Sequence, residues 1–299
     1  MKKYCLLILA SFVLTGKVYN QTLQQFFDLV SKKDTIGQQM LLEKWEQSNL
    51  NDPDLYVAYF NYYFLKSMKE VVRMDKNPRG KDAIQILDTL TKEPVGYLYS
   101  EKYFEPAIIN KGIAYIDKGI EKFPARLDMR FGKVYAFGEM SDYEDFTKEI
   151  INTINYSNII HNKWIWKDNK PLDNPKDYML GTIQNYQYQL YNTGSDSLLN
   201  NMALISKAIL KYYPDHVESL SNLSVVYLIQ ERYNEALDLL LKAEKINPED
   251  YIVLGNIAQT YKRKGDNSKA IKYYELVLKY GDDRAKRDAK EQIQEIKNK

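Results

Sequence analysis

Few side chains in this sequence are able to carry out chemistry, and they lie far apart. The chain contains one cysteine, Cys5, and two histidines, His161 and His216. No paired-histidine metal spacing, nucleophile elbow or phosphate-binding glycine loop occurs. An enzyme would therefore depend on carboxylates, tyrosines or lysines alone. We predict a protein that is not an enzyme, with no catalytic residue, no metal site and no cofactor, and both histidines at the surface.

One acidic group has a chemical and a structural interpretation. Asp142, Glu144 and Asp145 could supply an acid/base pair. Negative charge in such a cluster is more typical of a helix N-terminus, where it complements the helix dipole. We expect a helix start here.

A second group is aromatic. Trp164 and Trp166 would share one face of a short strand. Exposed tryptophans stack on sugars or clamp peptides, whereas buried ones would attach a hairpin to neighbouring helices. The sequence favours the buried arrangement, and aromatic contact with a ligand stays open as the alternative.

The composition favours long helices. The chain has 299 residues, 26 of them Tyr against 13 Gly and 9 Pro, with a formal net charge of +2 and a mean hydropathy of −0.51. Turn-rich all-β folds need more Gly and Pro. The nearly balanced charge argues against a nucleic-acid partner, and a single cysteine excludes a disulfide framework.

The N-terminus has the three parts of a secretory signal peptide. A basic start, Met1-Lys2-Lys3, precedes an apolar run from Tyr4 to Leu14 and a polar stretch that ends at Gln21. The apolar run is shorter than the roughly 20 residues that span a bilayer. We predict that residues 1–20 are removed and that the protein is exported to the periplasm or beyond the cell. The mature chain would then carry no stable membrane anchor and no cysteine, with 39 basic groups against 40 acidic ones.

A period of 34 residues is visible near the C-terminus. Nine residues of one segment recur in type in the next: Leu220, Asn222, Leu223, Ser224, Tyr227, Ala236, Leu237, Leu240 and Ala243 match Leu254, Asn256, Ile257, Ala258, Tyr261, Ala270, Ile271, Tyr274 and Val277. Their spacing predicts two amphipathic helices in each copy. Pro248 ends the second helix of the first copy. In the second copy Gly265 lies between the two helices, where glycine can take the left-handed conformation that closes a helix.

These two units, residues 217–284, resemble tetratricopeptide repeats. The resemblance implies a non-catalytic scaffold whose concave groove binds a segment of another protein. It places candidate groove residues on the first helix of each unit: Glu218, Ser221, Val225, Leu228, Ile229, Ile252, Gly255, Gln259, Lys262 and Arg263. Lys262 and Arg263 could take an acidic group of a partner, but capture of a C-terminal carboxylate is not favoured. The Lys/Asn carboxylate clamp of chaperone-binding members is not reproduced, because Ser221 and Val225 replace the polar pair that it needs.

Two such units cannot bury their faces alone, so we expect further helices on both sides. Residues 285–299 are predicted to form a capping helix, and residues 176–216 a degenerate unit of the same kind. Residues 21–175 form an N-terminal helical region whose predicted helices are 22–31, 36–47, 54–75, 103–122, 127–140 and 142–154. Short β-hairpins are expected near 83–99 and 164–172.

The sequence as a whole predicts an all-α superhelical solenoid of helix-turn-helix repeats, with one or two β-hairpin insertions in its N-terminal half. The predicted function is that of an exported protein–protein interaction scaffold. The alternative is a carbohydrate- or envelope-binding module that uses Trp164 and Trp166.

Overall fold

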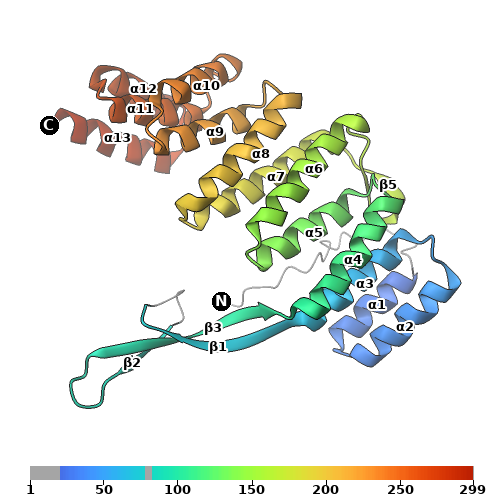
Figure 1. Ribbon diagram of the computed structural model, residues 1–299. Helices are drawn as coiled ribbons and strands as arrows, with labels where there is room; N and C mark the ends of the chain where they lie inside the picture. The colour runs from blue at the N-terminus through green and yellow to red at the C-terminus, as the bar shows by residue number, and fades with distance from the viewer. Residues whose placement is uncertain (1–20, 78–82, 299) are drawn as a thin grey trace. The chain divides into compact units, whose positions relative to one another are not determined.

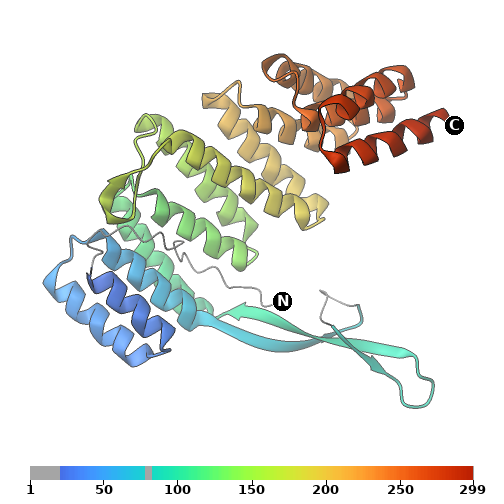
Figure 2. The same ribbon diagram turned by 180° about the vertical axis from the view of Figure 1, so that it is seen from behind.

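The computed structural model describes residues 21–77 and 83–298, so the signal peptide predicted for residues 1–20 lies outside the described residues. The chain divides into two compact units, each visible in Figures 1 and 2. Unit 1 holds the described residues up to Asp142 together with Lys163–Leu172. Unit 2 holds Tyr143–Asn162 and the chain from Asp173 onward. The predicted all-α fold with hairpin insertions in the N-terminal half is confirmed, whereas the break between units falls before the predicted 175/176 boundary.

Unit 1 contains five α-helices among its described residues: α1 (Gln21–Ser31), α2 (Thr35–Ser48), α3 (Pro53–Ser67), α4 (Pro106–Lys122) and α5 (Leu127–Glu139). Helix α3 begins where the sequence predicts it. The Asp52 carboxylate accepts a hydrogen bond from the Asp54 amide, and Pro53 occupies the first turn, where its missing N–H costs nothing.

Helices α3 and α4 approach closely because α4 presents glycines to α3. A Cβ atom on Gly119 would lie 2.8 Å from the Cβ atom of Tyr56, and one on Gly112 would lie 3.0 Å from the Cβ atom of Tyr63. The tyrosines of α3 therefore belong mainly to the core. The ring of Tyr59 stacks on Tyr115 of α4 with 4.0 Å between centroids.

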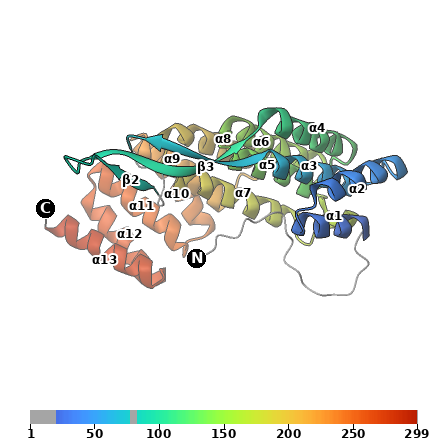
Figure 3. The same cartoon turned by 90° about the horizontal axis from the view of Figure 1, so that it is seen from below.

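The predicted helix 54–75 is wrong beyond Ser67, where the chain enters a β-ribbon. Strand β1 (Met68–Asp75) pairs with β3 (Pro94–Phe104), which also pairs with β2 (Ile84–Leu87), and both pairings are antiparallel. The strand order is β1-β3-β2, and the ribbon runs away from the helices of unit 1 (Figures 1 and 3). The hairpin predicted near 83–99 is confirmed. Strand β1 was not predicted, because its partner β3 begins 19 residues after β1 ends.

The second predicted hairpin is also present. Strands β4 (Ile165–Trp166) and β5 (Lys170–Pro171) flank the 3-10 turn η1 (Lys167–Asn169). The Ile165 amide donates to the carbonyl oxygen of Ala125 at 3.0 Å, which attaches the hairpin to the segment before α5. Trp164 is 1% exposed.

A buried arginine joins three segments of unit 1. Arg126, 1% exposed, donates from Nε and Nη2 to the two oxygens of Asp128 at 2.8 and 2.7 Å. Its Nη2 also donates to Asp54 at the start of α3 at 2.8 Å, and its Nη1 donates to Asn169 of the hairpin at 3.2 Å. Burial raises the pKa of the Asp54 carboxyl, and the arginine opposes that shift. The guanidinium therefore satisfies carboxylates that would be costly to bury alone.

Arg126→Met should lower the free energy of unfolding by about 3–5 kcal/mol, because it leaves buried carboxylates without their cation. A buried acid whose pKa is raised by folding is most stabilising below its unfolded pKa and loses that contribution as pH rises. The decrease in unfolding free energy caused by Arg126→Met should therefore be larger at pH 7 than at pH 5, as measured by urea denaturation. Adding Asp54→Asn should recover part of it and flatten the pH dependence. A loss below about 1 kcal/mol at both pH values would contradict this role.

Unit 2 is helical throughout its described residues. Its helices are α6 (Tyr143–Ile159), α7 (Pro175–Asn192), the 3-10 turn η2 (Asp196–Leu198), α8 (Leu199–Tyr212), α9 (Val217–Ile229), α10 (Tyr233–Ile246), α11 (Tyr251–Lys264), α12 (Asn267–Tyr280) and α13 (Asp283–Lys297). Glu144 and Asp145 lie in the first turn of α6, as predicted. Among the described residues, no helix is long and apolar enough to cross a bilayer.

The repeat spacing of the sequence appears directly in the helices. Helices α9 and α11 begin 34 residues apart, and so do α10 and α12. Gly265 takes the left-handed conformation, φ 89°, that separates α11 from α12. Ala236 and Ala243 of α10 are fully buried, and so is Ala270 of α12, the counterpart of Ala236, so both helix pairs have a small buried side chain at this position. The C-terminal part of the chain is a tetratricopeptide-repeat-like array.

Unit 2 has two layers of helices. Helices α9, α11 and α13 contact one another in sequence order, and α7 contacts α9 on the other side. We call α7, α9, α11 and α13 the inner helices. Helices α8, α10 and α12 each pack against the inner helices that precede and follow them along the chain (Figure 1).

Candidate functional site

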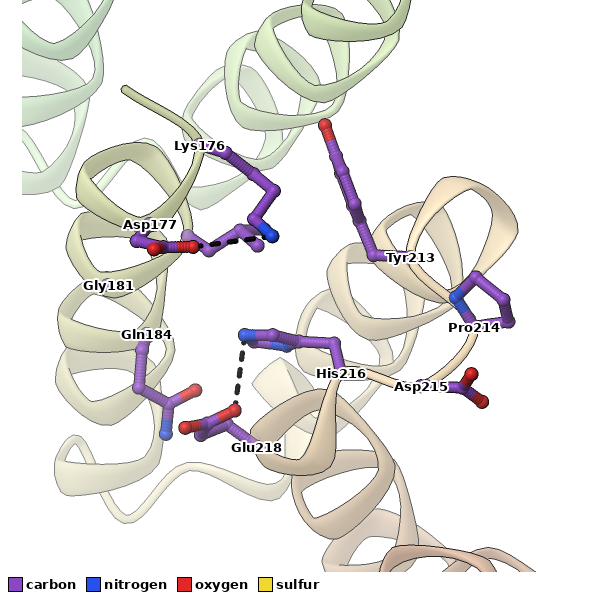
Figure 4. A pocket seen from close by; sticks show the side chains of 10 residues that line it. Lys176, Asp177, Gly181, Gln184, Tyr213, Pro214, Asp215, His216 and Glu218 are labelled. Carbon is purple, nitrogen blue, oxygen red and sulfur yellow. Dashed lines mark ion pairs between the residues drawn. The ribbon is translucent and has the colours of Figure 1, made fainter. Parts of the chain in front are cut away.

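A cavity of about 550 Å³ lies between the first half of α7 and the connection from α8 to α9 (Figure 4). This volume is in the range of pockets that hold small ligands or single large side chains. All of its lining residues belong to unit 2: Lys176, Asp177, Leu180, Gly181, Gln184, Tyr213, Pro214, Asp215, His216 and Glu218.

Helix α7 supplies one wall of the cavity. Lys176, Leu180 and Gln184 are four residues apart, so they lie on one helical face. Gly181 lies beside them, and a Cβ atom added there would meet no atom within 4 Å. The missing side chain of Gly181 therefore leaves part of the space open.

The amide of Gln184 also joins α7 to α9. Asn222 of α9 donates from Nδ2 to Gln184 Oε1 at 2.6 Å. The 34-residue counterpart of Asn222 is Asn256, which donates to Ser221 Oγ at 2.9 Å across the next pair of inner helices. The cavity thus lies beside the polar contact that fixes α7 against α9.

His216 caps α9 at the opposite wall. The Ser219 amide donates to His216 Nδ1 at 3.3 Å, and the Ser219 hydroxyl lies 2.8 Å from the same nitrogen. A ring nitrogen that accepts from an amide carries no proton, so the proton of the neutral ring is on Nε2. That nitrogen lies 3.2 Å from Glu218 Oε2.

Burial lowers the pKa of His216. The carboxylate of Glu218 opposes the shift, and the ammonium of Lys176 adds to it. The predicted surface position of His216 is wrong, because the side chain is 17% exposed and points into the cavity (Figure 4). His161 lies at the surface, as predicted.

The carboxylates of the cavity outnumber its ammonium group. Lys176 Nζ lies 3.5 Å from Asp177 Oδ1. Asp215 points away from the cavity and pairs with Lys242 at 3.1 Å (Figure 4). With His216 neutral, Glu218 gives the cavity an excess of negative charge. Residues 21–77 and 83–298 contain no group of three or more His, Cys, Asp or Glu side chains suited to a metal ion.

NMR titration of His216 should give a midpoint below the ordinary value of 6.5. Glu218→Gln should lower the midpoint further, because it removes the anion that favours the charged ring, and Lys176→Gln should raise it. Protonation removes the acceptor that caps α9, so the stability provided by neutral His216 is fully present above pH 6.5 and is lost as pH falls. His161→Gln assigns the two histidine signals. An unchanged or raised midpoint in Glu218→Gln would contradict this arrangement.

The structure separates the candidate groove residues into different environments. Glu218 lines the cavity, Ile252 and Arg263 are exposed, and Val225, Ile229, Gly255 and Gln259 are partly buried. Ser221 and Leu228 are buried, so the expectation that they face a ligand is wrong. The reason is the neighbouring inner helix: Ser221 accepts a hydrogen bond from Asn256 of α11.

Lys262 of α11 contacts α13, the last helix of the array. Its Nζ donates to Gln292 and to Glu295 of α13, both at 2.7 Å. The expectation that Lys262 receives an acidic group of a partner is therefore corrected: that acidic group is on the capping helix of the same chain. Arg263 is exposed beside it.

Trp164 cannot stack on a sugar in this structure, because it lies in the core of unit 1 beneath the guanidinium of Arg130, 5.9 Å from the ring centroid. Trp166 is partly exposed. Conversely, sequence reasoning missed the wall formed by Lys176, Gly181 and Gln184. The repeat pattern is weakest in α7, and a glycine in a helix gives no signal of the space it leaves.

Comparison with known proteins finds similarity to one family and to solved repeat proteins. The family model described as "Regulator of microtubule dynamics protein 1-3" matches residues 229–299, under a quarter of the chain, which hold α10 to α13. YrrB, described as a TPR protein with an unusual peptide-binding site, has 14% identity and a TM-score of 0.40, covering 84% of this chain and 97% of that one.

Two further solved structures are similar at the same level. The TPR domain of P58(IPK) has 13% identity and a TM-score of 0.35, covering 93% of this chain and 65% of that one. A tetratricopeptide repeat protein from Parabacteroides merdae has 12% identity and a TM-score of 0.37, covering 94% and 92%. Because these superpositions are loose, the repeat assignment rests on the 34-residue offset and the paired helices.

Proposed function

We propose that this protein is a non-catalytic interaction scaffold that binds an extended segment of a partner protein across α7 and α9. The observation that carries this proposal is the cavity between those two helices. Arrays of this kind hold preformed surfaces, so binding needs little conformational change.

The charges of the cavity favour a cationic side chain of the partner. Neutral His216 lies beside Glu218 but does not cancel its charge, and Lys176 Nζ already lies 3.5 Å from Asp177 Oδ1. A lysine or arginine side chain that enters beside Glu218 would gain a charge-assisted hydrogen bond. The apolar part of that side chain would lie against Leu180 and the open space at Gly181.

A displayed library of random 12-residue peptides tests this proposal. Peptides selected on the protein should be enriched in lysine or arginine, and Gly181→Phe should weaken their binding by at least about tenfold, because the ring occupies the space. Gly181→Ala is the matched control. It leaves most of the space open and should retain binding, while raising helix stability by about 0.5–1 kcal/mol.

Two results would overturn the proposal. One is that selected peptides bind Gly181→Phe and Gly181→Ala equally well, and the other is that no peptide is enriched over several rounds. Enrichment of acidic peptides that still lose binding in Gly181→Phe would retain the site and contradict the cationic preference.

The proposal includes export, for which the support is the basic start and short apolar run of residues 1–20. The mass and N-terminal sequence of the natively expressed protein should show a chain that begins near Gln21, recovered from the periplasm or the medium. A cytoplasmic protein that retains Met1 to Asn20 would contradict export. The binding experiment does not depend on this result.

A further inference from the structure

The β-ribbon of unit 1 has two edges that differ in protection. Strand β2 has four residues, and its pairing with β3 is interrupted by a register shift between Ile86 and Leu87. Strand β1 has eight residues in unbroken register with β3 and contains no proline or glycine. Short strands, bulges and prolines are the usual means by which proteins block edge pairing. The β1 edge has none of these protective features, and no described strand pairs with its outer side.

One face of the ribbon is apolar and exposed near that edge. Residues opposite one another in an antiparallel pair share a face, so Val72, Met74, Leu98 and Ile84 lie together. Val72 is 74% exposed, and Met74 and Ile84 are each 69% exposed. Exposed apolar patches on an open edge strand mark sites of association.

We propose that β1 pairs edge to edge with β1 of a second copy of this chain, about a two-fold axis at Val72. The two ribbons then form one antiparallel sheet in the strand order β2-β3-β1-β1-β3-β2, and the apolar faces of both copies become continuous. Backbone hydrogen bonds supply the pairing, and the side chains opposite each other select the register.

The charges of β1 select that axis. A two-fold axis perpendicular to the sheet keeps the same face upward in both copies, so it must pass through a residue position. Two positions of the axis, Val71 and Val72, allow seven residues of β1 to pair with the mate. An axis at Val71 would place Lys69 opposite Arg73 of the mate on both sides, which is repulsive.

An axis at Val72 places Lys69 opposite Asp75 of the mate, and Asp75 opposite Lys69. Val72 then meets Val72 of the mate, and no like charges are opposed. Lys69 also contacts Glu105 of its own chain at 2.7 Å, so its ammonium would lie between two carboxylates. This charge complementarity is what favours a second copy over an unrelated strand as the occupant.

Cysteine cross-linking in the full-length chain tests the register. In a Cys5→Ser background, Val72→Cys should form an intermolecular disulfide under mild oxidation, because opposed Cα atoms are roughly 4.5–5.5 Å apart. Val71→Cys is the matched control. Its two copies would be roughly 8 Å apart along the diagonal, beyond disulfide reach, and should stay monomeric on non-reducing gels.

Sedimentation velocity of the chain without added cysteines should show a concentration-dependent dimer. Val72→Asp should abolish it by opposing two carboxylates on the axis. Leu90→Asp, at a tip residue that is 90% exposed and outside the strands, should leave it intact. Lys69→Asp should weaken the dimer about tenfold, and adding Asp75→Lys should restore it.

A monomer at all concentrations tested would overturn the proposal, including the case in which a different protein occupies the edge. A dimer that survives Val72→Asp, or that cross-links through Val71→Cys and not Val72→Cys, would overturn it as well. These outcomes are independent of peptide binding at the cavity in unit 2.

Discussion

The fold of unit 2 depends on the need of each helix pair to bury its apolar faces against the next pair. Leu240 and Ala243 of α10 share a core cluster with Val253 and Ile257 of α11, so each pair buries part of its apolar surface against its neighbour. Stability in such arrays is a sum of contributions from pairs and from the interfaces between them. Every end of the array must therefore be closed by something other than a further repeat.

Helix α13 closes the C-terminal end. Ala289, Ile293 and Ile296 complete the core cluster formed by α11 and α12, and its other faces are charged. Lys262 is part of that closure, since it holds Gln292 and Glu295. From the sequence alone, a lysine at this position of an inner helix is interpreted as a ligand contact. The role of Lys262 is instead set by α13, whose Gln292 lies 30 residues later in the chain.

Unit 1 satisfies the same need with different contacts. Glycines of α4 allow close packing against the aromatic face of α3, and Arg126 joins the start of α3 to the hairpin and to α5. Because buried charges must be compensated, the arginine fixes segments that share no repeat pattern. The ribbon then extends from the end of α3 and the start of α4.

The sequence by itself determined the helical class, the 34-residue units, the helix boundaries set by Asp52-Pro53 and Gly265, and the presence of both hairpins. These features follow from local causes: periodicity, caps and backbone restrictions that act within a few residues. Tertiary structure alone decided that residues 68–75 form a strand, that Ser221 and Lys262 serve neighbouring helices, and that His216 lies in a cavity. Each of these depends on a partner distant in the chain, and burial or pairing by such a partner leaves no mark on local sequence.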